Sequence, residues 1–450
     1  MRVYVNARAS DSDSANRGSN PRPPAIPASA AGVPVSLSDR EARLGRVVLL
    51  TTHASPTPRQ ILLMGALAAR GGRPLSIGWD RSRSGGNIRV REDLLTVGVP
   101  APYGRRRLLL RHAAYHRTLV RALDDLVQAG DSPRVIVAGH LLHLPIARRF
   151  PQALWLYDAA EYYAEDLSAY FGPLAPLARP LVRLWERRLL GTVSGILSAD
   201  SAGGWFERRL AASGRPVLVV PNYPSRADDP PEPSRPAPHG AGVLAYAGGL
   251  QEDKGLFVML EAVAHLHRRG RAVRLLLVGP QRGSPERLDD RIRTLGLSSA
   301  VEVHPPLPYA ELVALLATRA DVALALYQPS HLDRGLGGSN ARKLFTYMQA
   351  GLALLVPDEG EVARPALEAE AALAVRTDDP AAVAAAAASL LDHPDDLARR
   401  KRLARSAFLE RHNWEVFAPV LDGWLGERLK AVPAPSTPGV ERRVEEPTRG

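Results

Sequence analysis

Two turns, each with a lysine nearby, are the parts of this 450-residue sequence best suited to bind an anion. The first contains Gly248 and Gly249, follows an apolar run and leads to Lys254. The second leads through Asn340 into a predicted helix whose first turn holds Lys343. Backbone N–H groups at such turns attract phosphate, and so does a helix dipole. Together the turns predict a diphosphate site, whereas each alone also fits an ordinary glycine turn beside a solvated lysine.

Polar side chains also follow the predicted strands of the first half. They are His53, His140, Asp158, Glu161 and Asn222. In open parallel α/β sheets, ligands bind outside the carboxyl ends of the strands. We therefore expect these side chains to gather around one ligand. The alternative for the histidines is a capping or solvated role in a loop.

Strand-like and helix-like segments alternate through two similar halves of the chain, which predicts βαβ units with right-handed crossovers. The segments with the short apolar runs of buried strands are residues 46–50, 74–78, 135–138, 153–157, 195–198, 217–220, 243–247, 273–278, 301–303, 322–326 and 352–356. The segments with helical spacing are residues 60–70, 105–129, 176–190, 256–269, 309–319, 380–391, 395–411 and 414–430. A further helix is predicted to start at a cap formed by Ser339 or Asn340 and to stop at Gly351.

The expected fold class is α/β, with two Rossmann-like domains facing across a cleft and helices at the C-terminus. A Pro-rich segment separates the two halves, and polar segments of low apolar content flank them. The predicted organisation is a disordered leader (1–45), an N-terminal domain (46–225), a linker (226–240), a C-terminal domain (241–412), a final helix (413–430) and a disordered tail (431–450).

The composition is 45% hydrophobic and 23% charged, which is typical of a soluble globular protein. No apolar run approaches the roughly 20 residues that a membrane span needs, and the polar N-terminus lacks the apolar region of a secretory signal. The sequence has no cysteine, which excludes disulfides and thiolate metal sites. We expect a cytoplasmic protein.

The net charge of +11 is concentrated in the first half, where residues 46–220 carry 24 Lys and Arg against 13 Asp and Glu. The densest basic cluster is 105–107 with Arg111, Arg117 and Arg121. Such a cluster suits an anionic membrane surface or a phosphorylated acceptor, and otherwise is a solvated basic face. Nucleic acid is not expected as a partner, because no nucleic-acid motif or interleaved aromatic residues accompany the charge.

Several segments, taken in order, resemble the nucleotide-sugar glycosyltransferases of the GT-B fold, in particular family 4. The resemblance spans residues 46–429 and rests on YDAAEYYAED (157–166), WERRL (185–189), VVPNYP (219–224), GGLQEDKG (248–255), LLLVGP (275–280) and KLFTYMQAGLALLVP (343–357). It implies that the C-terminal domain holds the nucleotide diphosphate of the donor and that the N-terminal domain holds the acceptor.

Residue roles follow from this resemblance. On the donor side it places Gly248, Gly249, Lys254, Gly279, Asn340, Lys343 and Thr346. On the acceptor side we place His140 and Asn222. Asp158, Glu161 and His53 become the candidate catalytic residues, since carboxylates suit an oxocarbenium-like transition state. Lys254 and Lys343, with Arg342 as a further candidate, would stabilise the leaving diphosphate.

The chain departs from the family pattern at three positions. Thr346 and Gly338 stand where the family has its paired glutamates, and Ala160 stands where it often has histidine. A threonine can hydrogen-bond a ribose but supplies no charge, so about 1–3 kcal/mol of charge-assisted bonding is lost.

The sequence thus predicts a hexosyltransferase-type enzyme of polysaccharide or glycoconjugate biosynthesis. It would move a sugar from a nucleotide diphosphate sugar to a hydroxyl of a glycan, a lipid-linked acceptor or a small molecule. The resemblance implies retention of configuration and no cofactor, and we predict no essential metal because the carboxylate pairs Asp228-Asp229 and Asp289-Asp290 are expected to be solvated. The alternatives are a non-catalytic GT-B homologue that binds a sugar nucleotide or a partner enzyme, and a nucleotide-sugar epimerase.

Overall fold

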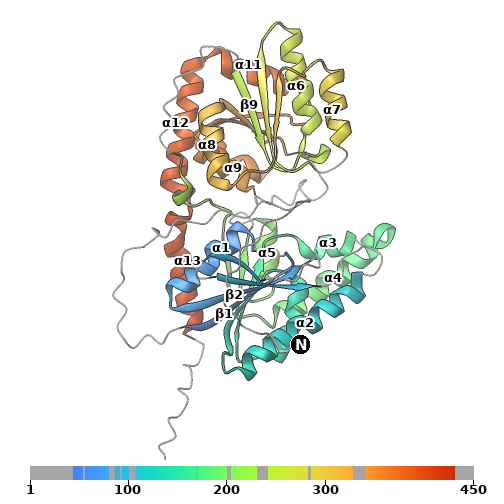
Figure 1. Cartoon of the computed structure of the whole chain (residues 1–450), viewed down its shortest axis with the longest axis vertical. Coiled ribbons are helices and arrows are strands. Elements are labelled where there is room, and N and C mark those ends of the chain that lie inside the picture. The colour runs from blue at the N-terminus through green and yellow to red at the C-terminus, as the bar shows by residue number, and fades with distance from the viewer. Residues whose placement is uncertain are drawn as a thin grey trace, which may run out of the picture.

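The computed structural model contains two sheets, one above the other, linked along one side by a column of two helices (Figure 1). It describes residues 44–53, 56–80, 87–91, 94–100, 108–169, 171–199, 204–230, 242–281, 285–327 and 341–430. The predicted leader up to residue 43, linker residues 231–240, the tail 431–450 and Asn340 lie outside this part of the chain. No helix in the described part is long and apolar enough to cross a membrane.

The first sheet has the strand order β3-β4-β2-β1-β5-β6-β7-β8 and is parallel except for the β3–β4 pair. Its strands are β1 (Gly45–Thr51), β2 (Gly72–Asp80), β3 (Asn87–Arg91), β4 (Leu94–Pro100), β5 (Pro133–Ala138), β6 (Leu154–Ala159), β7 (Gly195–Ser198) and β8 (Val217–Val219). The helices of this half are α1 (Pro58–Ala69), α2 (Leu108–Gln128), η2 (Leu141–Arg149), α3 (Tyr163–Ala169), η3 (Gly172–Leu174), α4 (Ala175–Leu190), α5 (Trp205–Ala211) and η4 (Arg226–Asp228).

The second sheet is parallel, with the order β11-β10-β9-β12-β13-β14. Its strands are β9 (Gly242–Ala247), β10 (Val273–Val278), β11 (Val301–His304), β12 (Val322–Leu324), β13 (Ala353–Pro357) and β14 (Ala372–Val375). Its helices are η5 (Glu252–Lys254), α6 (Leu256–Arg268), α7 (Pro285–Thr294), α8 (Tyr309–Arg319), α9 (Arg342–Gln349), η6 (Glu361–Ala363), α10 (Arg364–Glu368), α11 (Pro380–Asp392) and α12 (Pro394–Arg411). The last helix, α13 (Trp414–Leu429), follows α12 directly.

Local sequence explains where the helices begin. Thr57 and Gln60 form a capping box at the start of α1, with Pro58 at the first position. Pro380 and Pro394 occupy the first turns of α11 and α12 in the same way. The side chain of Asn413 caps α13.

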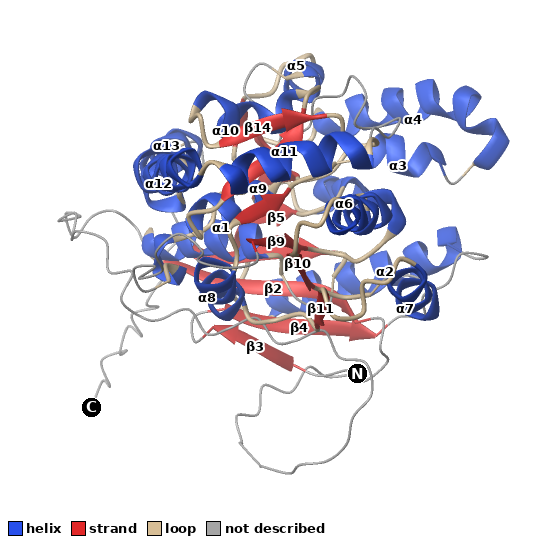
Figure 2. Cartoon of the chain, turned by 90° about the horizontal axis from the view of Figure 1, so that it is seen from above, coloured by secondary structure: helices blue, strands red, loops and turns tan. Residues whose placement is uncertain are grey.

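Helix α13 returns the chain to the first half. Trp414, Leu421 and Leu425 are buried with Val47 and Leu49 of β1 in one apolar cluster. Figure 2 shows α12 and α13 together on one side of the molecule. The chain therefore crosses between the two sheets twice, once after β8 and once between α12 and α13.

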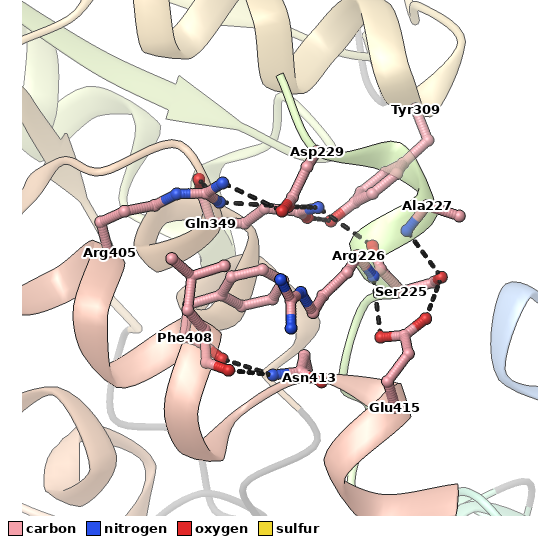
Figure 3. A network of polar contacts seen from close by, with 11 residues as sticks. Ser225, Arg226, Ala227, Asp229, Tyr309, Gln349, Arg405, Phe408, Asn413 and Glu415 are labelled. Carbon is pink, nitrogen blue, oxygen red and sulfur yellow. Dashed lines mark hydrogen bonds and ion pairs between the residues drawn. The ribbon is translucent and has the colours of Figure 1, made fainter. Parts of the chain in front are cut away.

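A polar network joins these two crossings (Figure 3). Asp229, which follows η4, forms a 2.9 Å ion pair with Arg405 of α12 and accepts a hydrogen bond from Gln349 of α9. Ser225 donates to Glu415 of α13 over 2.6 Å. Asp229 was expected to be solvated, and this prediction was wrong, because its partners lie more than 100 residues away in the sequence. Asp289 and Asp290 are exposed as expected.

The expected elements lack strands β3, β4 and β14 and helices α3, α5, α7 and α10, and one helix starts elsewhere than expected. Strands β3 and β4 were not predicted from the short segments that form them, and they gain their hydrogen bonds from β2 and from each other. Helix α9 begins at Arg342 after Ala341, which makes no side-chain cap. The predicted cap at residues 339–340 was therefore misplaced.

Candidate functional site

Two loops of the second sheet approach each other closely where β9 and β10 end. Gly248 donates its N–H to the carbonyl of Val278 over 2.9 Å, and Gly279 donates to the carbonyl of His304 over 3.1 Å. A Cβ on Gly279 would lie 2.0 Å from the carbonyl oxygen of Gly248. Both glycines have positive φ, +152° and +146°. Only glycine fits at Gly279, and the pairing brings bare backbone to the carboxyl edge of the sheet.

Lys343 lies against this glycine turn. Its Nζ donates to the Tyr246 hydroxyl over 3.2 Å and lies 4.6 Å and 4.7 Å from the ring centroids of Tyr246 and Tyr327. A Cβ on Gly248 would lie 3.5 Å from the same Nζ. Tyr246 in turn donates to the Gly249 carbonyl over 3.1 Å. The structure thus brings two predicted donor-side residues, Gly248 and Lys343, together and joins Gly249 to them through Tyr246.

Arg342, which precedes Lys343 at the start of α9, faces away from the glycine turn. The guanidinium of Arg342 lies 4.6 Å from the ring centroid of Tyr309, and its charge lowers the pKa of Asp228, a residue of η4. Burial outweighs that charge and raises the pKa of Asp228 overall. Arg342 is therefore directed toward the connection between the sheets, and the prediction that it would bind phosphate is not supported by its position.

Thr346 also faces inward. It is buried, donates to the carbonyl of Arg342 over 3.1 Å and lies 3.1 Å from the Tyr309 hydroxyl. Its hydroxyl is occupied within the protein and does not line the edge where Lys343 and Gly248 meet. A role for Thr346 in holding the donor remains a prediction.

Lys254 connects the two halves electrostatically. It ends η5, after Gly249, and is half-buried. Its charge lowers the pKa of Glu161, which follows β6 in the first half. Removal of surrounding water is the largest influence on Glu161, followed by the charge of Asp166, and together they raise its pKa to about 7. Glu161 nevertheless keeps an exposed side chain, so water still reaches the carboxylate.

Asp158 occupies a different environment from Glu161. Its carboxylate is fully buried, pairs with Arg59 of α1 over 2.9 Å and accepts a 3.3 Å hydrogen bond from Gln60. Arg59 also donates to the backbone carbonyls of Val220 and Leu197, at the ends of β8 and β7. Arg59 and Asp158 together thus tie α1 to the carboxyl ends of β6, β7 and β8. The carboxylate is therefore used within the fold in this conformation, and its catalytic role remains a prediction.

The remaining candidates of the first half, His140 and Asn222 on the acceptor side and the catalytic candidate His53, lie at the expected strand ends. His140 caps η2 by accepting from the N–H of Leu142 over 3.0 Å, and its ring lies 4.0 Å from that of Tyr163. His53 is exposed just after β1, and Asn222 is half-buried after β8. Because the strands from β1 to β8 through β5, β6 and β7 are parallel, the ends of β1, β5 and β8 that precede these residues lie along one edge of the sheet.

Sequence reasoning missed the aromatic residues around Lys343 and the network around Asp229. Tyr246 and Tyr327 belong to apolar strand segments, where aromatic residues are expected in any core. Gln349 and Arg405 lie on helices whose polar residues have no distinctive spacing. Arg59 was missed as well, because its burial beside Asp158 depends on the fold and no local pattern in the sequence indicates it.

Comparison with known proteins places these observations in context. Residues 241–393 match the family model described as "Glycosyl transferases group 1". The chain is 29% identical over 211 residues to glycogen synthase of Mycobacterium tuberculosis, which is 46% of this chain and 48% of that protein. It is 32% identical over 247 residues to D-inositol 3-phosphate glycosyltransferase of Kineococcus radiotolerans, 49% of this chain and 55% of that protein. The matches thus span about half the length of these curated relatives.

Solved structures agree over a larger share of the chain. Sucrose-phosphate synthase from Thermosynechococcus elongatus superposes with a TM-score of 0.67 at 16% identity, covering 86% of this chain and all of that one. The Anabaena protein HepE gives a TM-score of 0.61 at 13% identity, with 86% and 99% covered. These likenesses show the two-domain GT-B fold. With the match over 241–393, they confirm the predicted resemblance to GT-B nucleotide-sugar glycosyltransferases.

Proposed function

We propose that the protein is a glycosyltransferase that moves a sugar from a nucleotide diphosphate sugar to a hydroxyl acceptor. The observation that carries the proposal is the meeting of Gly248, Gly279 and Lys343 at the carboxyl edge of the second sheet. This edge belongs to the part of the chain that matches the group 1 glycosyltransferases. A half-buried glycine turn without side chains, beside a held lysine, lets a pyrophosphate approach the protein closely.

The leaving group dictates the chemistry at this edge. When the anomeric bond breaks, negative charge grows on the nucleotide diphosphate, and preorganised cations and N–H groups stabilise it. The two tyrosine rings and the Tyr246 hydroxyl already hold Lys343, so little reorganisation is needed. Lys254 supplies a second positive charge from the turn beyond Gly249. We propose that both lysines bind the diphosphate and that transfer requires no metal.

Glu161 is the carboxylate that best fits the opposite side of the reaction. A pKa of about 7 makes it partly protonated near neutral pH, so it can hold or release a proton as the acceptor hydroxyl reacts. Its negative form can also stabilise the positive charge that develops on the sugar ring. We propose retention of configuration, with Glu161 rather than buried Asp158 near the reacting carbon. His140 and Asn222 would lie on the acceptor side, and His53 is a further catalytic candidate.

The test is turnover with defined sugar nucleotides. HepE was crystallised with UDP-glucose, and a similar structure from E. coli was bound with UDP-2-fluoro glucose, so uridine nucleotides are the first probes. The full-length protein is incubated with UDP-, GDP-, dTDP- and ADP-sugars, with and without acceptor sugars. Nucleotide release that requires an acceptor supports the proposal. A changed sugar without acceptor would indicate an epimerase instead.

Absence of both binding and release would favour a non-catalytic homologue. The buried hydroxyl of Thr346, hydrogen-bonded within the protein, is the observation that favours this second candidate. Ala160→His separates the two cases, because position 160 is half-buried and can accept a larger side chain more readily than position 346. An enzyme tuned to alanine should lose rate with the histidine, whereas a homologue that lost its activity should gain some.

A further inference from the structure

Helix α4 exposes leucine and buries glutamate, the reverse of the usual arrangement on a protein surface. Leu177 and Leu181 are 72% and 69% exposed, and Leu184 is also exposed, at the spacing of one helix face. Phe171 and Leu174, in the turn that leads into the helix, are exposed as well. We call these five residues the leucine ridge.

Ion pairs fix the inner face of α4 to α3 and α5. Glu186 is 2% exposed and forms an ion pair with Arg209 of α5. Arg209 also pairs with Glu165 of α3 over 2.6 Å, and Arg183 of α4 pairs with the same carboxylate over 2.8 Å. Both arginines lie over the ring of Trp205, 5.2 Å and 5.7 Å from its centroid. Turning the helix to bury the leucines would leave Glu186 and Arg209 without each other, so the network fixes the ridge outward.

The ridge projects from the molecule and is bordered by positive charge. In Figures 1 and 2, α3 and α4 extend outward beyond the first sheet. Arg179, Arg187 and Arg188 are exposed on the same helix, whose one acidic residue is the buried Glu186. An apolar stripe of Leu and Phe with flanking arginines is the pattern of helices that lie in the interface of an anionic bilayer.

We propose that the leucine ridge of α4 docks the protein on an anionic membrane surface. The ridge residues would enter the boundary between headgroups and acyl chains, while the arginines bind lipid phosphates. A second copy of this chain is a poorer occupant, because pairing two ridges would bring together the arginine-rich first half of each molecule. The proposal rests on α4 alone and does not depend on the donor site.

Flotation of the full-length protein with lipid vesicles tests this proposal. The wild-type protein should float with vesicles of phosphatidylcholine and phosphatidylglycerol, and at least about tenfold less with phosphatidylcholine alone. The triple substitution Leu177→Gln, Leu181→Gln, Leu184→Gln should lower binding to anionic vesicles by about tenfold or more. Arg187→Gln with Arg188→Gln should lower it several-fold and weaken its dependence on salt.

A matched control uses apolar residues exposed elsewhere. Val416 and Val420 lie four residues apart on α13 and are also exposed, so Val416→Gln with Val420→Gln should bind vesicles like the wild type. Circular dichroism checks that every variant is folded. Equal flotation of the triple variant and the wild type would overturn the proposal, as would a lack of wild-type flotation. A wild-type dimer that the triple substitution converts to monomer would show instead that the ridge binds a second copy.

Discussion

The carboxyl edges of the two sheets are built on opposite principles. At the second edge, the candidate site is shaped by backbone, since Gly248 and Gly279 approach so closely that a side chain on Gly279 would overlap a carbonyl. At the first edge, it is carried by side chains, and some of these are used for structure. Asp158 is buried against Arg59, while Glu161, three residues on, is exposed and has a pKa near 7.

The difference shows which kind of residue a sequence motif identifies reliably. Where two backbones must pack against each other, only glycine fits. A glycine turn after a buried strand therefore predicts the local backbone conformation well. A carboxylate at a strand end can serve either the fold or a ligand. Only its partners decide, and the partner of Asp158 lies 99 residues earlier in the chain.

The largest expected effect comes from removing the charge of Asp158. Asp158→Asn leaves Arg59 buried without its carboxylate, which should lower the free energy of unfolding by about 3–5 kcal/mol. Urea unfolding followed by tryptophan fluorescence measures it. The control is Asp290→Asn, an exposed position on α7, with an expected change within about 0.5 kcal/mol. Equal stability of the two variants would show that Asp158 does not serve the fold.

The glycine contact gives the next largest effect. Gly279→Ala forces its Cβ against the Gly248 carbonyl, so the loops must separate, at a cost of about 3 kcal/mol in unfolding free energy and with loss of the donor edge. Gly296→Ala is the matched control, because Gly296 also has positive φ but its Cβ would meet nothing within 4 Å. That control should cost about 1 kcal/mol. Similar losses in both variants would mean that the close approach is unimportant.

The network between the crossings should contribute less, because it is partly solvated. Arg405→Met removes the ion pair with Asp229 and a 2.7 Å hydrogen bond to the Gln349 carbonyl. We expect a loss of about 1–2 kcal/mol. Arg399 lies on the same helix and forms exposed ion pairs with Asp396 and Glu370. Arg399→Met should therefore cost about 0.5 kcal/mol. Urea midpoints of the two variants decide the matter, and a larger loss for Arg399→Met would contradict the account.

The smallest effect concerns the pH dependence of stability at Glu161. Its pKa is about 4.5 in the unfolded chain and about 7 in the folded protein. Between these values the folded state binds the extra proton, so this group's contribution to stability falls as pH rises from about 4.5 to 7. Glu161→Gln should therefore raise the melting temperature relative to wild type more at pH 8 than at pH 4.5. The same variant should slow transfer at least about tenfold. A pH-independent difference in melting temperature would refute the raised pKa.

Much of the fold followed from sequence because its local signals agreed. Apolar runs marked β9, β10 and β13, and helical spacing marked α11 and α12. The edge strands β3 and β14 and the neighbouring β4 were missed, since their short segments are stabilised by neighbouring strands rather than by their own pattern. At the site, Gly248 and Lys343 could be predicted to meet. The inward turn of Thr346 could not, because it depends on Tyr309, a residue of another helix.

The most direct test of the central claim is calorimetric titration of sugar nucleotides into the wild-type protein and two lysine variants. We expect saturable binding of at least one nucleotide diphosphate sugar. Lys343→Met and Lys254→Ala should each weaken this binding at least about tenfold. Arg287→Gln, an exposed cation on α7 paired loosely with Glu252, should bind as the wild type does. Binding that is unchanged in both lysine variants, or absent from folded wild-type protein, would contradict a donor site at this edge.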